Sequence, residues 1–330
     1  CGELRKEHID SQVRLAGWVN NYRDHGGVIF IDLRDHEDIT QVVFHPDQAE
    51  AHTLADRLRH EDVVAVEGKV VPREAGMENP KLATGQIEVE ATHLEILNKS
   101  LTPPFTPGDA GRVNEEMRLK FRYIDLRRPD MQKILRTRHR AIKVIRDYFD
   151  EQGFCEIETP FLCKSTPEGA RDFLVPSRLQ QSAFYALPQS PQLFKQILMV
   201  SGMDKYMQIV RCFRDEDPRA DRQAEFTQLD LELSFADVDD VMAVTEGVVR
   251  RVWKQILGVD IPTIQRMTYQ EAMTRFGTDR PDLRFDVELI DLSDLATKTD
   301  FGVFQGAMQS GGMVKAICVP GGAGMTRKET

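Results

Sequence analysis

Cysteine is scarce and irregularly spaced in this chain of 330 residues. The five cysteines are Cys1, Cys155, Cys163, Cys212 and Cys318, and no two of them form a CxxC pair. An odd, scattered set argues against both a disulfide framework and a structural zinc site. We therefore expect free thiols in a reducing compartment, and we predict a cytoplasmic protein.

Long apolar runs are also missing, although 41% of the residues are hydrophobic. No run approaches the length of about 20 residues that a membrane-spanning helix needs. The N-terminus lacks the charged and then apolar layout of a signal peptide. We predict no membrane partner, and we expect the natural start of the chain to be missing, because the first residue is Cys1 rather than Met.

Several common catalytic motifs are absent as well. The sequence contains no GxxxxGK[ST] loop, no GxGxxG after a strand, no HExxH and no GxSxG. These absences argue against P-loop, dinucleotide-binding, zinc-protease and α/β-hydrolase chemistry. A protein that handles phosphates without such loops needs side-chain cations, and Arg214 is the candidate.

The net charge of −10 argues, taken alone, against a nucleic-acid partner. However, residues 118–146 concentrate arginine and lysine, with only Asp125 and Asp130 opposing them. Such a block is typical of a track for a phosphate backbone, and equally of a solvated helix face with internal ion pairs. Charge alone does not choose between these two interpretations.

The first hundred residues have the pattern of a small β-barrel. Short stretches rich in Val, Ile and Phe predict strands at 13–19, 28–33, 40–44, 63–71 and 86–96. A helical interlude at 48–59 separates the third strand from the fourth. The pattern fits a five-stranded barrel of the oligonucleotide-binding (OB) type, and a β-sandwich would give similar signals.

A proline-rich stretch at 101–108 then predicts a linker, because proline cannot donate to a sheet. The remainder mixes helices with strands and predicts an α+β fold. Expected helices are 133–152, 192–200 and 239–257, and expected strands are 154–159, 207–213 and 226–234. We predict a domain at 1–100, a hinge at 101–127, a second domain at 128–285 and an incomplete α+β segment at 286–330.

The last two of these strands carry candidate functional residues. Alternation places Phe226, Gln228, Asp230 and Glu232 on one face, and the preceding strand ends at Arg214. A guanidinium group can bind a phosphate, and an aromatic ring can stack a purine. The alternative is an ordinary hairpin with a charged tip and a half-polar outer face.

Longer motifs resemble the bacterial aspartyl-tRNA synthetases, which are class II aminoacyl-tRNA synthetases. FRDED at 213–217, Arg222, Gln223 and EFTQLDLE at 225–232 resemble their second signature motif. The helix at 133–152 followed by GFCEIETP at 153–160 resembles the first, whose proline, Pro160 here, lies at the dimer interface. TPEGARD at 166–172 resembles the substrate-covering loop, and FYALPQSPQLFKQ at 184–196 resembles the amino-acid-binding segment. The resemblance covers essentially the whole chain and implies a homodimer.

The resemblance implies roles for individual residues. Those expected at the aspartate substrate are Glu168, Ser190, Gln192, Lys195, Arg214, Gln228 and Asp230. Those expected at ATP are Arg214, Asp215, Glu216, Gln223 and Phe226. Without the resemblance, Lys195 would be interpreted as a solvated helix lysine and Glu168 as a turn residue. Glu232 is left open between a solvated carboxylate and a magnesium ligand.

Barrel residues would contact the tRNA anticodon in such a family: Arg23, His25, Phe30, Gln41 and Asn79. For Phe30 the alternative is core packing, which aromatic residues usually favour. DHGG at 24–27 and AGMENP at 75–80 resemble the subgroup that charges both the aspartate and the asparagine tRNAs. His25 stands where relatives restricted to aspartate tRNA carry leucine.

The glycine-rich third motif of class II is not found, and PGGAG at 320–324 resembles the family's insertion domain instead. We expect that motif, and most ligands of the Mg²⁺ that accompanies ATP, beyond residue 330, so that these residues alone would be inactive. The expected reaction is ATP-dependent charging of tRNA with aspartate. The rivals are an asparagine- or lysine-specific synthetase and a non-catalytic tRNA-binding protein.

Overall fold

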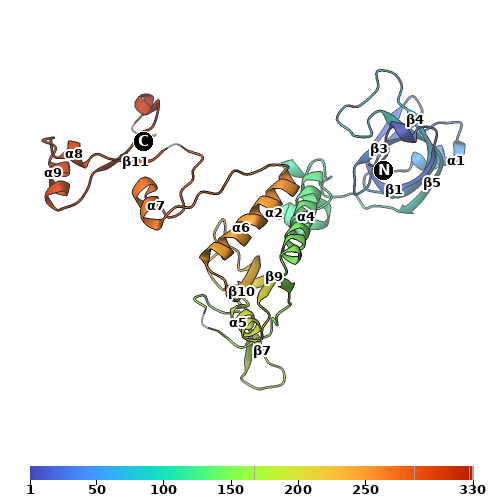
Figure 1. The fold of residues 1–330 in the computed structure, drawn as a ribbon. Helices are drawn as coiled ribbons and strands as arrows, with labels where there is room; N and C mark the ends of the chain where they lie inside the picture. Colours follow the sequence, from blue (N-terminus) through green and yellow to red (C-terminus); the bar gives the residue numbers. More distant parts are fainter. Residues whose placement is uncertain (167, 286, 327, 329–330) are drawn as a thin grey trace. The chain divides into compact units, whose positions relative to one another are not determined.

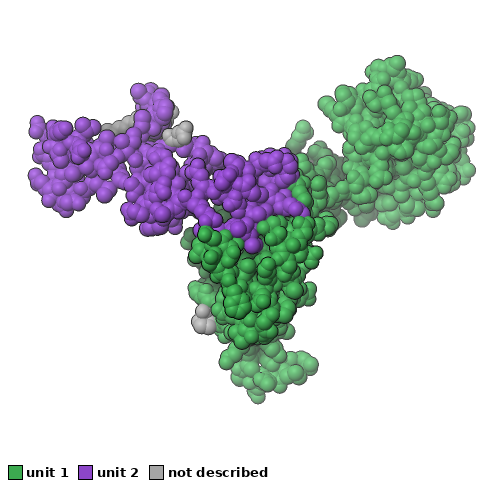
Figure 2. Space-filling model, in the orientation of Figure 1, with its two compact units in different colours: residues 1–241, 255–257 green, residues 242–254, 258–330 purple. Residues whose placement is uncertain are grey.

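The computed structural model describes residues 1–166, 168–285, 287–326 and 328. The chain divides into two compact units (Figure 2), residues 1–241 with 255–257, and residues 242–254 with 258–330. No helix within the described residues has the length and apolar content that crossing a bilayer requires. Pro167, in the motif at 166–172, lies outside the described residues.

Five strands close into the expected barrel in the order β1-β2-β3-β5-β4 (Figure 1). They are β1 (Gln12–His25), β2 (Val28–Arg34), β3 (Ile39–Phe44), β4 (Val63–Pro72) and β5 (Ile87–Asn98), with α1 (Ala49–Ala55) before β4. Closure pairs every strand on both sides and removes exposed edges. The barrel prediction is therefore confirmed, and the sandwich alternative is wrong.

Alternate residues of the strands fill the barrel interior. Val19, Ile31, Leu33 and Leu94 are almost completely buried and belong to one apolar cluster. At Gly17 a Cβ atom would lie 2.3 Å from the carbonyl oxygen of Arg34, so the close approach of β1 to β2 requires glycine there. The period-two pattern of the sequence thus becomes the core through burial of one strand face.

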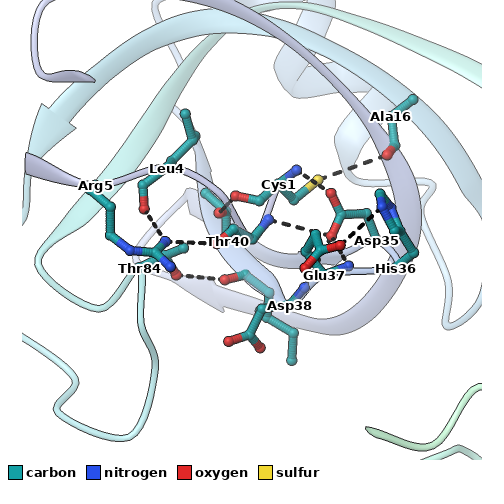
Figure 3. Close-up of polar contacts among 12 residues, drawn as sticks. Cys1, Leu4, Arg5, Ala16, Asp35, His36, Glu37, Asp38, Thr40 and Thr84 are labelled. Carbon is teal, nitrogen blue, oxygen red and sulfur yellow. Dashed lines mark hydrogen bonds and ion pairs between the residues drawn. The ribbon is translucent and has the colours of Figure 1, made fainter. Parts of the chain in front are cut away.

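The segment before β1 is held against the barrel by polar contacts (Figure 3). The Thr40 hydroxyl donates to the carbonyl oxygen of Cys1 at 2.8 Å, and the Gly2 amide donates to Asp35 Oδ1 at 3.3 Å. The Thr84 hydroxyl donates to the carbonyl oxygen of Ile39 at 2.5 Å. These bonds satisfy backbone groups of Cys1 and Gly2 and of Ile39, where β3 begins.

Helices follow the barrel: η2 (Ala110–Arg112), α2 (Glu115–Lys120), α3 (Arg122–Asp125) and α4 (Pro129–Glu151). Asp125 is buried and pairs with three arginines of the basic block, Arg118, Arg122 and Arg128. On α4, Lys143 pairs with Asp147 at 2.7 Å, and Arg146 pairs with Glu156 at 2.8 Å. These cations therefore have ion-pair partners within the chain, as the second interpretation expects.

A three-stranded sheet follows, in the order β10-β9-β6. Its strands are β6 (Cys155–Glu156), β9 (Lys205–Phe213) and β10 (Glu225–Leu233). A separate hairpin joins β7 (Leu174–Pro176) to β8 (Phe184–Ala186), and α5 (Gln192–Val200) precedes β9. The strand expected at 154–159 is shorter than predicted, because the ladder to β9 ends at Glu156 before the chain turns toward Pro160.

The second compact unit contains most of α6 (Val238–Val252) and the elements after it. These are α7 (Tyr269–Phe276), β11 (Leu289–Asp291), α8 (Ser293–Ala296), α9 (Gly302–Gln309), β12 (Lys315–Ile317) and η4 (Gly322–Gly324). The helix predicted at 239–257 has two parts, because α6 gives way to a π-helical segment, Trp253–Leu257 (η3), which ends at Gly258 in the left-handed conformation. Strands β11 and β12 pair antiparallel, and this part of the chain is α+β as predicted.

The barrel core provides a matched stability test on β5. Leu94 is 1% exposed, whereas Leu97 on the same strand is 49% exposed. We predict that Leu94→Ala lowers the free energy of unfolding by about 2–5 kcal/mol, because it deletes buried methyl groups and leaves a cavity. Leu97→Ala should change it by less than about 0.5 kcal/mol. Denaturant unfolding measures both values, and equal effects of the two variants would contradict the core assignment.

Candidate active site and nucleic-acid interface

The β9–β10 register places the candidate site residues of β10 on one face of the second sheet. Opposed residues of an antiparallel pair project to the same side. The pairs on this face are Cys212 with Phe226, Val210 with Gln228, Gln208 with Asp230, and Tyr206 with Glu232. The predicted alternation of Phe226, Gln228, Asp230 and Glu232 is therefore confirmed.

Lys195 reaches this face from α5 and is only 9% exposed. Its Nζ donates to Asp230 Oδ1 at 2.9 Å and to the carbonyl oxygen of Leu231 at 3.3 Å, and it lies 3.2 Å from Glu232 Oε2. The solvated-lysine interpretation is therefore wrong. Glu232 is half-buried and ion-paired, so the solvated-carboxylate interpretation of that residue is wrong too.

The charge on Lys195 depends on these partners. Burial alone would lower the pKa of Lys195, but its hydrogen bonds and ion pairs with Asp230 and Glu232 outweigh this and raise it above the ordinary value. The second oxygen of Asp230, Oδ2, is buried and has no hydrogen-bond partner among the described residues. The face thus combines one fixed cation with a surplus of carboxylate.

The other end of the face carries Arg214, directly after β9. Its guanidinium carbon lies 5.1 Å from the centre of the Phe226 ring. Cys212 donates its thiol hydrogen to Gln228 Oε1 at 3.2 Å. Burial raises the pKa of Cys212 to about 11, with Arg214 lowering it and the charges of Asp230 and Glu168 raising it. The charges of Arg214, Asp230 and Glu168 therefore all influence the Cys212 thiol.

The loop at 165–172 brings Glu168 to the segment that precedes α5. Glu168 accepts hydrogen bonds from the Ser190 hydroxyl at 2.6 Å and the Thr166 hydroxyl at 2.8 Å. Gln192, the first residue of α5, is half-buried. Glu168 is therefore hydrogen-bonded to the segment at 184–196. Its interpretation as a mere turn residue does not explain this bond.

The β9–β10 connection contains the other residues predicted at ATP. Asp215 and Glu216 line a cavity of about 390 Å³ together with Gly169, Ala170, Arg171, Asp217, Arg219 and Arg222. Gln223 is exposed and does not line this cavity. Residues 169–171 and the β9–β10 connection thus form one charged hollow.

A second hollow, of about 710 Å³, lies on the barrel. All five residues predicted at the anticodon line it: Arg23, His25, Phe30, Gln41 and Asn79. Phe30 is half-buried and lies outside the barrel's apolar cluster, with its ring centre 6.0 Å from that of His25. The core-packing interpretation of Phe30 is therefore wrong.

Polar side chains form a chain of hydrogen bonds across this barrel groove. Arg23 donates to both oxygens of Asp32 at 2.9 and 2.8 Å and to Gln41 Oε1 at 3.2 Å. Gln41 in turn donates to Glu88 Oε2 at 2.7 Å. Burial raises the pKa of Glu88, while Gln41 and Arg73 lower it. Sequence analysis missed Asp32, Arg73 and Glu88, although strand alternation places Asp32 beside Phe30 and Gln41.

Pro160 follows the sheet in an exposed position, next to Phe161 and Leu162, which are 43% and 55% exposed.

Among the described residues, no group of three or more His, Cys, Asp and Glu side chains could hold a metal ion.

Comparisons with known proteins agree with this geometry. The family model described as "tRNA synthetases class II (D, K and N)" matches residues 114–314. The chain belongs to this family. A second family model, "OB-fold nucleic acid binding domain", matches residues 13–97. The resemblance and the fold class predicted from the sequence are thereby confirmed.

Curated relatives extend over the whole chain. This chain is 58% identical to an "Aspartate--tRNA(Asp/Asn) ligase" from Desulfosudis oleivorans, and the match covers 100% of this chain and 55% of that protein. It is 54% identical to an "Aspartate--tRNA ligase" from Macrococcus caseolyticus, covering 97% of this chain and 55% of that protein. The chain therefore spans about half the length of these relatives.

A solved relative is asparaginyl-tRNA synthetase from Pyrococcus horikoshii, complexed with asparaginyl-adenylate. The TM-score is 0.70 at 26% sequence identity, covering 86% of this chain and 63% of that one. The similarity to a solved synthetase thus extends over most of this chain.

The Cys212 environment predicts a specific pH dependence of thiol alkylation. Because the thiolate is the reactive form and the pKa of Cys212 is about 11, this thiol stays protonated near neutral pH. We predict that iodoacetamide labels the exposed Cys155 and Cys318 first at pH 8, and that labelling of Cys212 accelerates about tenfold per pH unit toward pH 10. Peptide mass spectrometry measures each rate. Labelling of Cys212 as fast as Cys155 at pH 8 would contradict the buried, carboxylate-flanked position.

Proposed function

We propose that the full-length protein is an aspartate–tRNA ligase that charges tRNA(Asp) and also tRNA(Asn). In the first step aspartate and ATP give aspartyl-adenylate and pyrophosphate. In the second, the aspartyl group passes to the terminal adenosine of tRNA. The observation that carries the proposal is the buried Lys195 cation on a carboxylate-rich sheet face.

Lys195 would bind the side-chain carboxylate of aspartate. Its ammonium group is already oriented by Asp230 and Glu232, so little conformational entropy is lost when the substrate arrives. An ammonium group forms a stronger hydrogen bond with a charged carboxylate than with a neutral amide, which favours aspartate over asparagine. The remaining residues proposed at the amino acid would surround its ammonium group: Glu168, Ser190, Gln192, Gln228 and Asp230.

Arg214 would bind the α-phosphate of ATP and the reacting carboxylate. An oxygen of that carboxylate attacks the α-phosphorus, the bond to the β-phosphate oxygen breaks, and pyrophosphate leaves with the bonding pair. The carboxylate is already deprotonated, so the step needs charge neutralisation and positioning more than a general base. Phe226 would stack the adenine, and Asp215, Glu216 and Gln223 would contact ATP. Mg²⁺ would enter with ATP.

The barrel groove would bind the anticodon. Single-stranded RNA is read by stacking on aromatic rings and by hydrogen bonds to splayed bases. Phe30 and His25 offer rings, while Arg23, Gln41 and Asn79 offer polar groups in the same hollow. The OB-fold family match supports this role.

We further propose a homodimer, with exposed Pro160 and its neighbours Phe161 and Leu162 at the interface. The proposed domains are the barrel at 1–100, a hinge at 101–127, the catalytic domain at 128–285 and an insertion beginning at 286. The five free cysteines support a reducing compartment, the cytoplasm.

ATP–pyrophosphate exchange by the full-length protein tests the proposal. We predict exchange that depends on aspartate and not on asparagine or lysine. Lys195→Met should lower kcat/KM for aspartate by about 30-fold or more, because a buried, hydrogen-bonded charge partner is lost. Lys205→Met, on the opposite face of the same sheet, is the matched control and should retain activity.

The same assay separates the rival functions. Exchange driven by asparagine or lysine would replace the aspartate assignment with another synthetase of this family. No exchange with any amino acid, alongside intact tRNA binding, would support a non-catalytic tRNA-binding protein. Lys195→Arg keeps the charge, so a folded Lys195→Arg protein with partial activity would separate loss of charge from loss of folding.

A second prediction concerns tRNA choice. His25 lines the barrel groove next to Phe30, so its side chain is placed to contact an anticodon base. We predict that His25→Leu lowers kcat/KM for charging tRNA(Asn) relative to tRNA(Asp), leaving pyrophosphate exchange unchanged. Aminoacylation of the two purified tRNAs measures the ratio. An unaltered ratio would remove His25 from the specificity assignment.

A further inference from the structure

The buried side-chain amide of Gln189 holds the loop that contains residues 170–172. Gln189 precedes α5 and is only 2% exposed. Its Nε2 donates to the carbonyl oxygen of Ala170 at 2.8 Å, and its Oε1 accepts from the amide of Ala170 at 3.0 Å. The side chain thus pairs with the loop backbone in the two-bond manner of a neighbouring strand. A third bond, from Nε2 to Asp172 Oδ1 at 2.6 Å, satisfies the remaining amide hydrogen.

Arg171, the next residue of the loop, bonds to the β9–β10 connection rather than to Gln189. Arg171 forms an isolated antiparallel bridge with Asp215, in the connection between β9 and β10. The Asp215 amide donates to the carbonyl oxygen of Arg171 at 3.0 Å, and Arg171 Nε donates to the carbonyl oxygen of Asp215 at 3.3 Å. Three consecutive residues, 170–172, therefore join Gln189 on one side to Asp215 on the other.

These two anchors belong to different halves of the proposed site. Gln189 is adjacent to Ser190, whose hydroxyl donates to Glu168 in the same loop. Asp215 is adjacent to Arg214, which stacks on Phe226. Because Gln189 is buried and fully hydrogen-bonded, releasing the loop would leave a buried amide without partners, which is costly. The loop therefore favours a position in which both anchors are engaged.

We propose that Gln189 is a positioning residue whose side-chain amide fixes residues 170–172 as a bridge between the aspartate and ATP half-sites. Residues 170–172 hold the two half-sites in one relative position, so a substrate that stabilises one half-site also stabilises the other, and binding of either substrate strengthens binding of the other. Such coupling is reciprocal by thermodynamic necessity. This inference rests on the proposed aspartate–tRNA ligase function.

The test is calorimetric titration of the full-length protein with aspartate, with and without a non-hydrolysable ATP analogue. We expect the analogue to tighten aspartate binding in the wild type by a factor within the usual range of about 5–150. In Gln189→Ala the factor should fall below about twofold, and aspartate should tighten the analogue equally weakly. Gln181→Ala, an exposed amide between β7 and β8, is the matched control and should keep the wild-type factor.

A second variant, Arg171→Ala, tests the proposal even if the Gln189→Ala protein does not fold. Arg171→Ala removes an exposed side chain and its bond to Asp215, leaves the core untouched, and should reduce the coupling factor partially. A folded Gln189→Ala protein with the wild-type factor, or a wild type whose factor is one, would overturn the inference. So would Arg171→Ala with undiminished coupling when Gln189→Ala does not fold. Failure of the proposed function itself would appear separately, as a wild type without aspartate-dependent pyrophosphate exchange.

Discussion

The buried ion pairs of Lys195 with Asp230 and Glu232 determine how helix α5 packs on the β9–β10 sheet. A buried ammonium group is expensive unless its partners and hydrogen bonds are well placed. Here α5 supplies the cation and alternate residues of β10 supply the anions, so helix and sheet must dock in one register. The interaction fixes geometry and charge together, as the proposed site for a small dicarboxylic amino acid requires.

The proposed site extends from these ion pairs along one sheet face and the adjacent loop. Cys212 and Gln228 lie between the Lys195 cluster and the Arg214–Phe226 pair, and the loop at 165–172 adds Glu168. Positive groups at the two ends suit a carboxylate and a phosphate, and the carboxylates between them suit an ammonium group. The barrel groove combines aromatic rings with hydrogen-bonded polar side chains, which suits the proposed binding of unpaired bases.

Local patterns in the sequence predicted most of the strands and helices. The features that they did not predict depend on contacts between residues far apart in the chain. Alternation located the barrel strands and the functional face of β10, because one buried side imposes a period of two. The burial of Lys195 was not predictable from helix spacing, since its partner Asp230 lies 35 residues away. The pairing of Gln189 with Ala170 and of Gln41 with Glu88 likewise depends on loops and strands brought together only by folding. Family resemblance selected the site residues, whereas their hydrogen-bond partners came from the structure.

The most direct measurement is a crystal structure of the full-length protein bound to a non-hydrolysable aspartyl-adenylate analogue. The account predicts that Lys195 Nζ lies about 2.7–3.2 Å from the side-chain carboxylate of the ligand. It also predicts the Arg214 guanidinium at the phosphate, on the same face of the sheet. A ligand whose carboxylate is bound by another cation, with Lys195 still enclosed by Asp230 and Glu232 alone, would contradict it.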